Sequence, residues 1–142
     1  MIHNRLAWDE YLAAQALLIS NRVTCNRANV GAVLVKDKKV IANVYNGSVS
    51  GTDHCLEDGC LMVEGHCVRT IHAEVIAILQ GAERVVPKGF TAYVTHFPCL
   101  NYTKQLLQVV CKRVVYRHQY QIDEYAEYLY REKEVELVHL PI

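Results

Sequence analysis

Residues 72–102 run HAEVIAILQGAERVVPKGFTAYVTHFPCLNY, and this stretch decides the fold that we expect. In its first part, 72–84, apolar residues recur with the period of a helix. A turn at 87–89 leads into an apolar strand over 90–95, and Pro98 is typical of the first turn of another helix. Helix, strand and helix in this order predict one crossover unit of an α/β sheet.

The flanking sequence adds a hairpin before this unit and further strands behind it. Asp37-Lys38 is a short charged link between two β-branched runs, which predicts a β-hairpin. The helix that begins at Pro98 is expected to run through Val110. The other expected elements are helices over 5–21 and 122–132 and strands over 30–36, 39–45, 112–117 and 135–140. Together they predict one α/β domain over 1–142, with a mixed five-stranded sheet between helices on both faces.

The composition limits the classes of protein to which the chain can belong. Its 142 residues suit one domain, and 51% hydrophobic with 21% charged residues suit a folded core. Lys plus Arg and Asp plus Glu each number 15, so the basic field that drives non-specific nucleic-acid binding is lacking. No apolar run approaches the ~18 residues of a membrane span, and residues 1–10 carry no apolar signal segment. We therefore expect a cytoplasmic protein without membrane or nucleic-acid partners.

Two expected helix starts carry the residues that could perform chemistry. His72-Ala73-Glu74 opens one helix, and Pro98-Cys99-Leu100-Asn101-Tyr102 opens the next. Successive helices of a parallel sheet begin beyond the carboxyl ends of its strands, so His72 and Cys99 can meet there. A helix N-terminus favours a thiolate, and a thiolate with an imidazole is a donor pair typical of zinc. Glu74 would face the open position of that metal. Each motif alone is more often an ordinary helix start, but the pair in this order favours a metal site.

The paired motifs resemble the H-x-E and P-C-x-x-C signature of the zinc-dependent nucleobase deaminases. The runs VGAV (30–33), YNGS (45–48) and AYVTH (92–96), with a Cys/His-rich insert at about 48–71, narrow the resemblance to deoxycytidylate (dCMP) deaminases. It covers nearly the whole chain and is nearest to the streptococcal members encoded among late-competence genes. The resemblance implies a three-layer α/β/α cytidine-deaminase-like fold and a hexamer. It also implies hydrolysis of dCMP to dUMP and ammonia by a zinc-bound hydroxide, with dCTP as activator and dTTP as inhibitor.

Carried over residue by residue, the resemblance implies roles for the motif positions. His72 and Cys99 would be ligands of a catalytic Zn²⁺, and Glu74 would shuttle the proton of the water to the ring and the leaving ammonia. Asn46 would hydrogen-bond the sugar. The other candidates for contact with substrate or effector are Tyr45, Gly47, Ser48, Ser50, Arg27 and Tyr120. A solvated charge is the alternative for Arg27, and a surface tyrosine is the alternative for Tyr120.

The sequence departs from the family pattern at four positions. Tyr102 stands where the pattern has a cysteine as third zinc ligand, and a phenol is longer and less soft than a thiolate. Ile76 replaces an asparagine, while Val44 and Val110 replace glycines that would permit a tight backbone. Catalytic zinc usually has three protein ligands and a water, so we expect an impaired site. Cys111 lies more than two turns along the same expected helix, and we interpret it as a core residue.

The Cys/His-rich insert predicts a second, structural zinc, which some dCMP deaminases carry at this place. A loop from 46 to 71 is too long for a compact domain unless something staples it. Zinc held by cysteine and histidine is the natural staple in a cytosolic chain. The expected ligands are Cys25, Cys55 and Cys67 with one of Cys60, His54 or His66. Scattered thiols that bind no metal are the alternative.

Three functions compete at this point. The first is a dCMP deaminase with an altered zinc site, and the second is a catalytically inactive nucleotide-binding or regulatory homologue with the same fold. The third is a deaminase that acts on a flipped base of a polynucleotide, which the zero net charge disfavours. Intact His72, Glu74 and Cys99 favour the enzyme, whereas Tyr102 favours loss of turnover.

Overall fold

The structure is a computed structural model that describes residues 5–22, 30–45, 47–48, 62–63, 66–67, 70–71, 88–119 and 122–141. The long elements are α1 (Trp8–Ile19), β1 (Gly31–Lys36), β2 (Lys39–Tyr45), β7 (Phe90–His96), α4 (Leu100–Gln108), β8 (Cys111–His118), α5 (Glu124–Glu132) and β9 (Glu136–His139). A 3-10 turn over Ser20–Arg22 extends α1. The short strands are β3 (Gly47–Ser48), β4 (Met62–Val63), β5 (His66–Cys67) and β6 (Thr70–Ile71). The helix expected over 72–84 lies outside the described residues.

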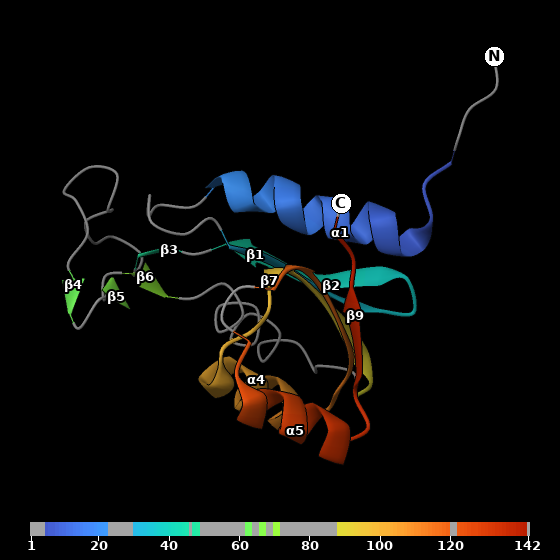
Figure 1. Ribbon diagram of the computed structural model, residues 1–142. Helices are drawn as coiled ribbons and strands as arrows, with labels where there is room; N and C mark the ends of the chain where they lie inside the picture. The colour runs from blue at the N-terminus through green and yellow to red at the C-terminus, as the bar shows by residue number, and fades with distance from the viewer. Residues whose placement is uncertain are drawn as a thin grey trace.

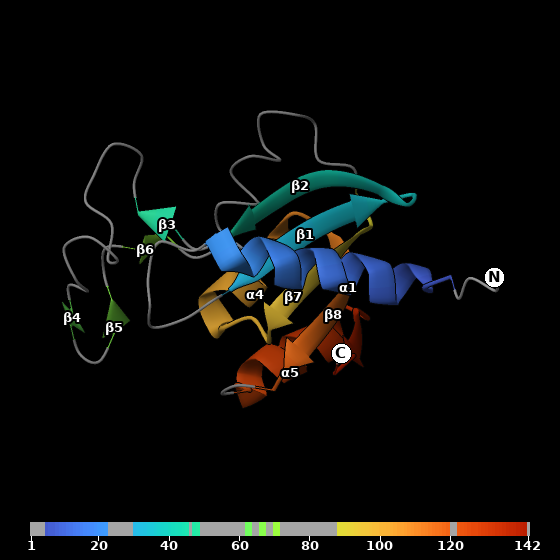
Figure 2. The same ribbon diagram turned by 90° about the horizontal axis from the view of Figure 1, so that it is seen from above.

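Within the described residues, five strands form one mixed sheet in the order β2-β1-β7-β8-β9. β1 pairs antiparallel with both β2 and β7, whereas β7, β8 and β9 run parallel. α1 covers one face of this sheet, and α4 and α5 cover the other (Figures 1 and 2). The expected three-layer α/β/α arrangement and mixed sheet are therefore confirmed.

The hairpin predicted at Asp37-Lys38 is also confirmed, and its backbone explains why the turn is so short. Both residues have positive φ, 50° and 64°, which is the backbone of a two-residue turn whose twist matches that of the flanking strands. Lys38 places its ammonium 5.3 Å from the centre of the Trp8 ring, so the turn also contacts the start of α1.

Several predicted boundaries were wrong, including those of α5, which begins at Glu124 rather than 122, and of β9, which spans Glu136–His139 rather than 135–140. α4 ends at Gln108 rather than running through Val110, and Cys111 is the first residue of β8 rather than part of the helix. α1 begins at Trp8, three residues after the expected start. The stretch expected to be a loop holds two short antiparallel ladders, β3 with β6 and β4 with β5. The interpretation of Cys111 as a core residue is confirmed, because the side chain is buried.

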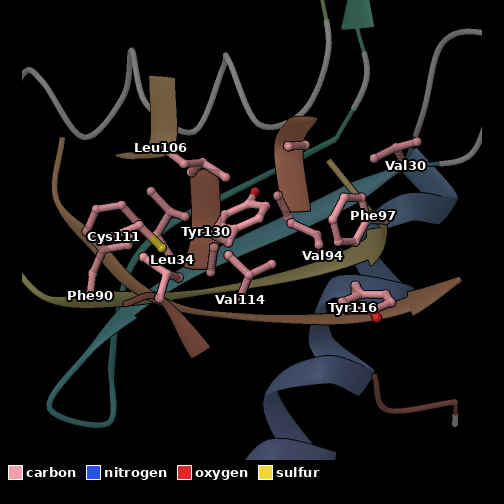
Figure 3. Packing of buried hydrophobic residues seen from close by; sticks show 14 of the residues in the cluster. Val30, Leu34, Phe90, Val94, Phe97, Leu106, Cys111, Val114, Tyr116 and Tyr130 are labelled. Carbon is pink, nitrogen blue, oxygen red and sulfur yellow. The ribbon is translucent and has the colours of Figure 1, made fainter. Parts of the chain in front are cut away.

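Strand alternation divides the apolar residues between the two faces of the sheet. The α4/α5 face holds the larger cluster, which includes Leu34, Phe90, Val114 and Tyr130 (Figure 3). The α1 face holds a smaller cluster of Leu12, Ala16, Val33, Val35, Tyr93 and Val115. Gly31 is required where the end of α1 crosses β1, because a Cβ there would lie 2.2 Å from the carbonyl oxygen of Ala16. Among the described residues, no helix is long and apolar enough to cross a membrane.

A charged network fixes the first turn of α1 to the sheet. The Arg113 guanidinium of β8 donates two hydrogen bonds to the Asp9 carboxylate, at 2.7 Å and 2.6 Å. The Tyr93 hydroxyl of β7 donates a third at 2.7 Å, and Arg113 Nε donates to Glu136 of β9 at 3.1 Å. The fork geometry of arginine suits such a two-point contact. One carboxylate therefore joins α1 to two neighbouring strands.

The network predicts a stability that depends on pH through Asp9. Hydrogen bonding from Arg113 holds the pKa of the Asp9 carboxyl below its usual value despite burial, and the Tyr93 hydroxyl adds to the lowering. A group with a lowered folded-state pKa stabilises the fold above its unfolded pKa, about 3.9, and loses this contribution as the pH falls through the folded value. Asp9→Asn should therefore cost about 1–2 kcal/mol at pH 7, moderated by solvent screening, and less at pH 3.

Urea unfolding of both proteins at pH 7 and pH 3 measures this difference. Glu10→Gln is the matched control, since it removes the same charge from the same helical turn. A gap between the wild type and Asp9→Asn that stays constant across this pH range would contradict the assigned role of Asp9.

The chain leaves both α4 and α5 through a residue in the left-handed region. After α5, Glu134 has φ 56°, and the amide of Val135 donates to the Tyr130 carbonyl at 2.8 Å, which completes a Schellman ending. After α4, Val110 takes the same position with φ 64°, although a β-branched residue is strained there. Its amide donates to the Leu107 carbonyl at 3.1 Å, and its carbonyl accepts from Gly89 at 2.8 Å.

Val110→Gly should therefore stabilise the protein by about 0.5–1 kcal/mol, because relief of the strained φ exceeds the added entropy of the unfolded chain. The Val110 side chain is 45% exposed, so its removal sacrifices little packing. Val109→Gly is the control: Val109 has an ordinary φ of −93° and packs against the core, so its replacement should destabilise. Thermal unfolding of the two variants tests the sign, and a lower midpoint for Val110→Gly would refute the strain argument.

Candidate active site

Cys99 lies three residues after the carboxyl end of β7, at the start of α4. After His96 the chain turns away from the sheet, and the Phe97 amide donates to the His118 carbonyl of β8 at 3.0 Å. Pro98 is fully buried, and Cys99 takes the N-cap position of α4 with extended backbone angles. Its thiol is exposed and is not part of a disulfide. A helix N-terminus favours the thiolate, so the fold places a nucleophilic or metal-binding sulfur at this edge.

Tyr102 is the third residue of α4, and Cys99 is its N-cap. The N-cap and third residues lie on the same side of a first turn, as in the capping box. A C-x-x-C pair at these positions would bring two sulfurs to one point. In this chain the second position holds a half-buried phenol, whose oxygen extends farther from the backbone than a cysteine sulfur.

Of the two expected zinc ligands that the structure describes, Cys99 suits zinc and Tyr102 does not. Cys99 supplies an exposed thiolate position at a helix N-terminus, which suits zinc. Tyr102 supplies a donor of different length and softness, which does not suit it. Across residues 5–22, 30–45, 88–119 and 122–141 and the short strands, no three His, Cys, Asp or Glu side chains are grouped to hold a metal. His72 and Glu74, expected to complete the site, lie outside the described residues.

A chain of hydrogen bonds, partly buried, supports the strand end just before this turn. The Gly31 amide donates to the Thr95 hydroxyl at 3.0 Å, and this hydroxyl lies 2.9 Å from Nδ1 of His96. Burial lowers the pKa of His96, and the nearby His118 and Arg117 lower it further, so the ring is neutral at pH 7. A neutral ring can accept the Thr95 proton at Nδ1. The sequence analysis had cited His96 only as part of a motif and assigned it no role.

A second histidine, His139 of β9, is hydrogen-bonded to residues at the end of β8. His139 Nε2 donates to the Arg117 carbonyl at 2.9 Å, because a carbonyl oxygen can only accept. Nδ1 of the same ring is then the acceptor for the Gln119 amide at 3.3 Å. The ring also stacks on Tyr116, with centroids 5.2 Å apart. This histidine was not singled out from the sequence, since no local motif marks it.

Two segments with predicted substrate contacts are brought together by backbone pairing. Gly47 pairs with Ile71 and Ser48 with Thr70 in the ladder of β3 with β6. In the sequence Asn46 precedes Gly47 and His72 follows Ile71, and both lie outside the described residues. Tyr45 ends β2 immediately before Asn46.

Most of the remaining predicted site residues lie outside the described part of the chain. Asn46, Ser50, Arg27 and Tyr120 lie outside the described residues, as do Ile76 and the insert residues Cys25, His54, Cys55 and Cys60. His66 and Cys67 form β5, which pairs with Met62 and Val63 of β4. The roles assigned to all these residues stay predictions.

Comparison with known proteins gives consistent similarities. Residues 6–118 match the family model "Cytidine and deoxycytidylate deaminase zinc-binding region". ComE operon protein 2 of Bacillus subtilis (strain 168) is 46% identical over 129 residues, which cover 90% of this chain and 68% of that protein. Deoxycytidylate deaminase of Saccharomyces cerevisiae is 32% identical over 126 residues, covering 84% of this chain but only 40% of the yeast protein.

Among solved structures, the dCMP deaminase of cyanophage S-TIM5 in complex with dCMP and dUMP aligns with a TM-score of 0.83 and 28% identity. The alignment covers 97% of this chain and all of the phage chain. The similarity to this phage structure therefore extends over nearly the whole chain.

Proposed function

Because the family model covers residues 6–118, this chain belongs to the cytidine and deoxycytidylate deaminase family, and we propose that its substrate is dCMP, which it hydrolyses to dUMP and ammonia. The observation that carries the proposal is the place of Cys99, an exposed thiol at the N-cap of α4 beside the carboxyl end of β7. The relatives named deoxycytidylate deaminase and the phage structure with dCMP and dUMP support the choice of nucleotide.

His72 and Cys99 are the residues that would hold Zn²⁺, which when bound supplies an activated water for hydrolysis of the exocyclic amine. Glu74, two residues after His72, would take a proton from water and pass it to the ring nitrogen and the leaving ammonia. Asn46 would orient the sugar through its side-chain amide. Tyr120 and Arg27 are the proposed contacts for the base and the phosphate.

We further propose that Tyr102 impairs this activity. Two good ligands and one phenol hold zinc more weakly than two thiolates and an imidazole, so metal occupancy and turnover should both be low. The same residue supports a second candidate function, a homologue that binds the nucleotide without turning it over. Binding of dCMP without release of ammonia distinguishes this candidate from the enzyme.

We propose that dCTP and dTTP regulate the chain, that it forms a hexamer, and that a second Zn²⁺ staples the Cys/His-rich insert. The ligands proposed for this structural zinc are Cys25, Cys55 and Cys67 with one of Cys60, His54 or His66.

Tyr102→Cys should raise both zinc content and the rate of ammonia release from dCMP. The change restores a thiolate at the third residue of α4, on the same side of the first turn as Cys99. The recovery should be partial, since Ile76 and Val44 still depart from the family pattern. Zinc per chain by elemental analysis and a coupled ammonia assay measure the two effects.

Glu74→Ala in the Tyr102→Cys background is the control, and it should abolish turnover while zinc stays bound. An unaltered protein that already deaminates dCMP at about 1 per second or faster would show that Tyr102 is not damaging.

The structural zinc should persist where the catalytic one is weak, because the two proposed sites share no ligand. Protein purified without chelators should contain about one zinc per chain, and Cys55→Ser should remove it while Cys111→Ser should not. Cys111 is the matched control because it is a buried core thiol at the start of β8. Absence of bound zinc in the unaltered protein would overturn this proposal.

A further inference from the structure

A buried pair of hydroxyls joins the first turn of α4 to the last turn of α5. Thr103 Oγ1 and the Tyr130 hydroxyl lie 2.8 Å apart, and neither residue has any exposed surface. The two residues are 27 positions apart in the sequence. A polar pair enclosed in an apolar cluster is costly unless both partners are present, so it fixes the relative position of the two helices closely.

Tyr130 also contacts the other end of the turn that carries Cys99. Its ring meets the Phe97 ring edge-on, with centroids 5.9 Å apart, and Phe97 packs in the same way on Tyr116 at 5.0 Å. Figure 3 shows Tyr130 in the centre of the buried cluster, with Phe97 and Tyr116 at the end of the sheet toward which β7 runs. Thus Tyr130 touches residues 97 and 103, which bracket the five residues from Pro98 to Tyr102.

Within residues 97–103, hydrogen bonds connect Tyr130 through Thr103 to Cys99, the N-cap of α4. The Thr103 hydroxyl donates to the Pro98 carbonyl over a long 3.4 Å, and the Thr103 amide donates to the Cys99 carbonyl at 2.9 Å. The Thr103 hydroxyl therefore lies between the Pro98 carbonyl and the Tyr130 hydroxyl and contacts both. Thr103 is therefore hydrogen-bonded to the carbonyls of both Pro98 and Cys99, and its hydroxyl also contacts Tyr130.

We propose that Tyr130 is a positioning residue for the ligand turn, defined as residues 98–102, and sets where the sulfur of Cys99 stands. This inference rests on the proposed zinc site. Tyr130 acts through Thr103 and Phe97. Without its hydroxyl, Thr103 loses a buried partner and the turn gains freedom to shift. Metal geometry is sensitive to such outer contacts, whose loss typically weakens metal binding 10- to 100-fold.

The test uses Co²⁺ in the Tyr102→Cys protein, because the visible bands of cobalt report coordination geometry. The spectrum of the Cys99→Ser version is subtracted, which removes any cobalt bound by the insert. Adding Tyr130→Phe should shift or weaken the Cys99-dependent bands and lower cobalt affinity by about 10-fold. Thr103→Val should act in the same way, whereas Thr103→Ser keeps the hydroxyl and should restore the spectrum.

Tyr93→Phe is the matched control. It removes a tyrosine hydroxyl that donates a hydrogen bond of 2.7 Å, but on the α1 face of the sheet. It should lower stability without changing the cobalt bands. Equal effects of Tyr93→Phe and Tyr130→Phe on the bands would mean a general loss of stability and would overturn the positioning role.

A measurement without metal separates this inference from the proposed function. In the unaltered protein, Tyr130→Phe should speed hydrogen exchange of the Thr103 amide about 10-fold more than Tyr93→Phe does, because this amide closes the ligand turn on Cys99. Unchanged exchange overturns the positioning role whatever the cobalt result. Faster exchange, together with no cobalt bound by Tyr102→Cys, rejects the zinc site and with it the inference that rests on it.

Discussion

The parallel pairing of β7 with β8 is the constraint on which the rest of the molecule depends. Parallel neighbours cannot be joined by a tight turn, so the chain must leave β7, cross as α4 and return to start β8. This crossover obliges α4 to begin where β7 ends. Its first residues therefore lie at the carboxyl edge of the sheet, where Phe97 is hydrogen-bonded to His118. The position of Cys99 follows from this topology, and only its precise orientation depends on side chains.

The helices on the two faces of the sheet are attached by different kinds of interaction. On one face, a carboxylate, a guanidinium and a phenol attach α1 to β7 and β8, and solvent reaches this network. On the other face, α4 and α5 enclose aromatic rings and one hydroxyl pair that solvent does not reach. Acid should therefore loosen α1 first, because the Thr103–Tyr130 hydroxyl pair and the aromatic rings on the α4/α5 face carry no group that titrates in acid.

The sequence predicts those parts of the molecule that local patterns encode. β7 and the hairpin of β1 with β2 follow from β-branched runs and a two-residue link, and the start of α4 follows from Pro98. Contacts between distant residues leave no such pattern: Asp9 and Arg113 are 104 positions apart, and Thr103 and Tyr130 are each ordinary in their helices. The left-handed backbone at Val110 was also missed as a helix end, because valine there hides the usual glycine signal.

Two departures from the family pattern fall at opposite ends of one helix, and their consequences differ in kind. Val110 follows α4 in a strained backbone conformation and is exposed, so this departure lowers the free energy of unfolding. Tyr102 lies in the first turn, whose cap and closing residue are both tied into the buried cluster through Pro98 and Thr103. Because that turn is held independently of the helix end, strain at Val110 has no direct route to Cys99. Of these two departures, Tyr102 is therefore the one expected to weaken metal binding, through the identity of the donor rather than the position of the backbone.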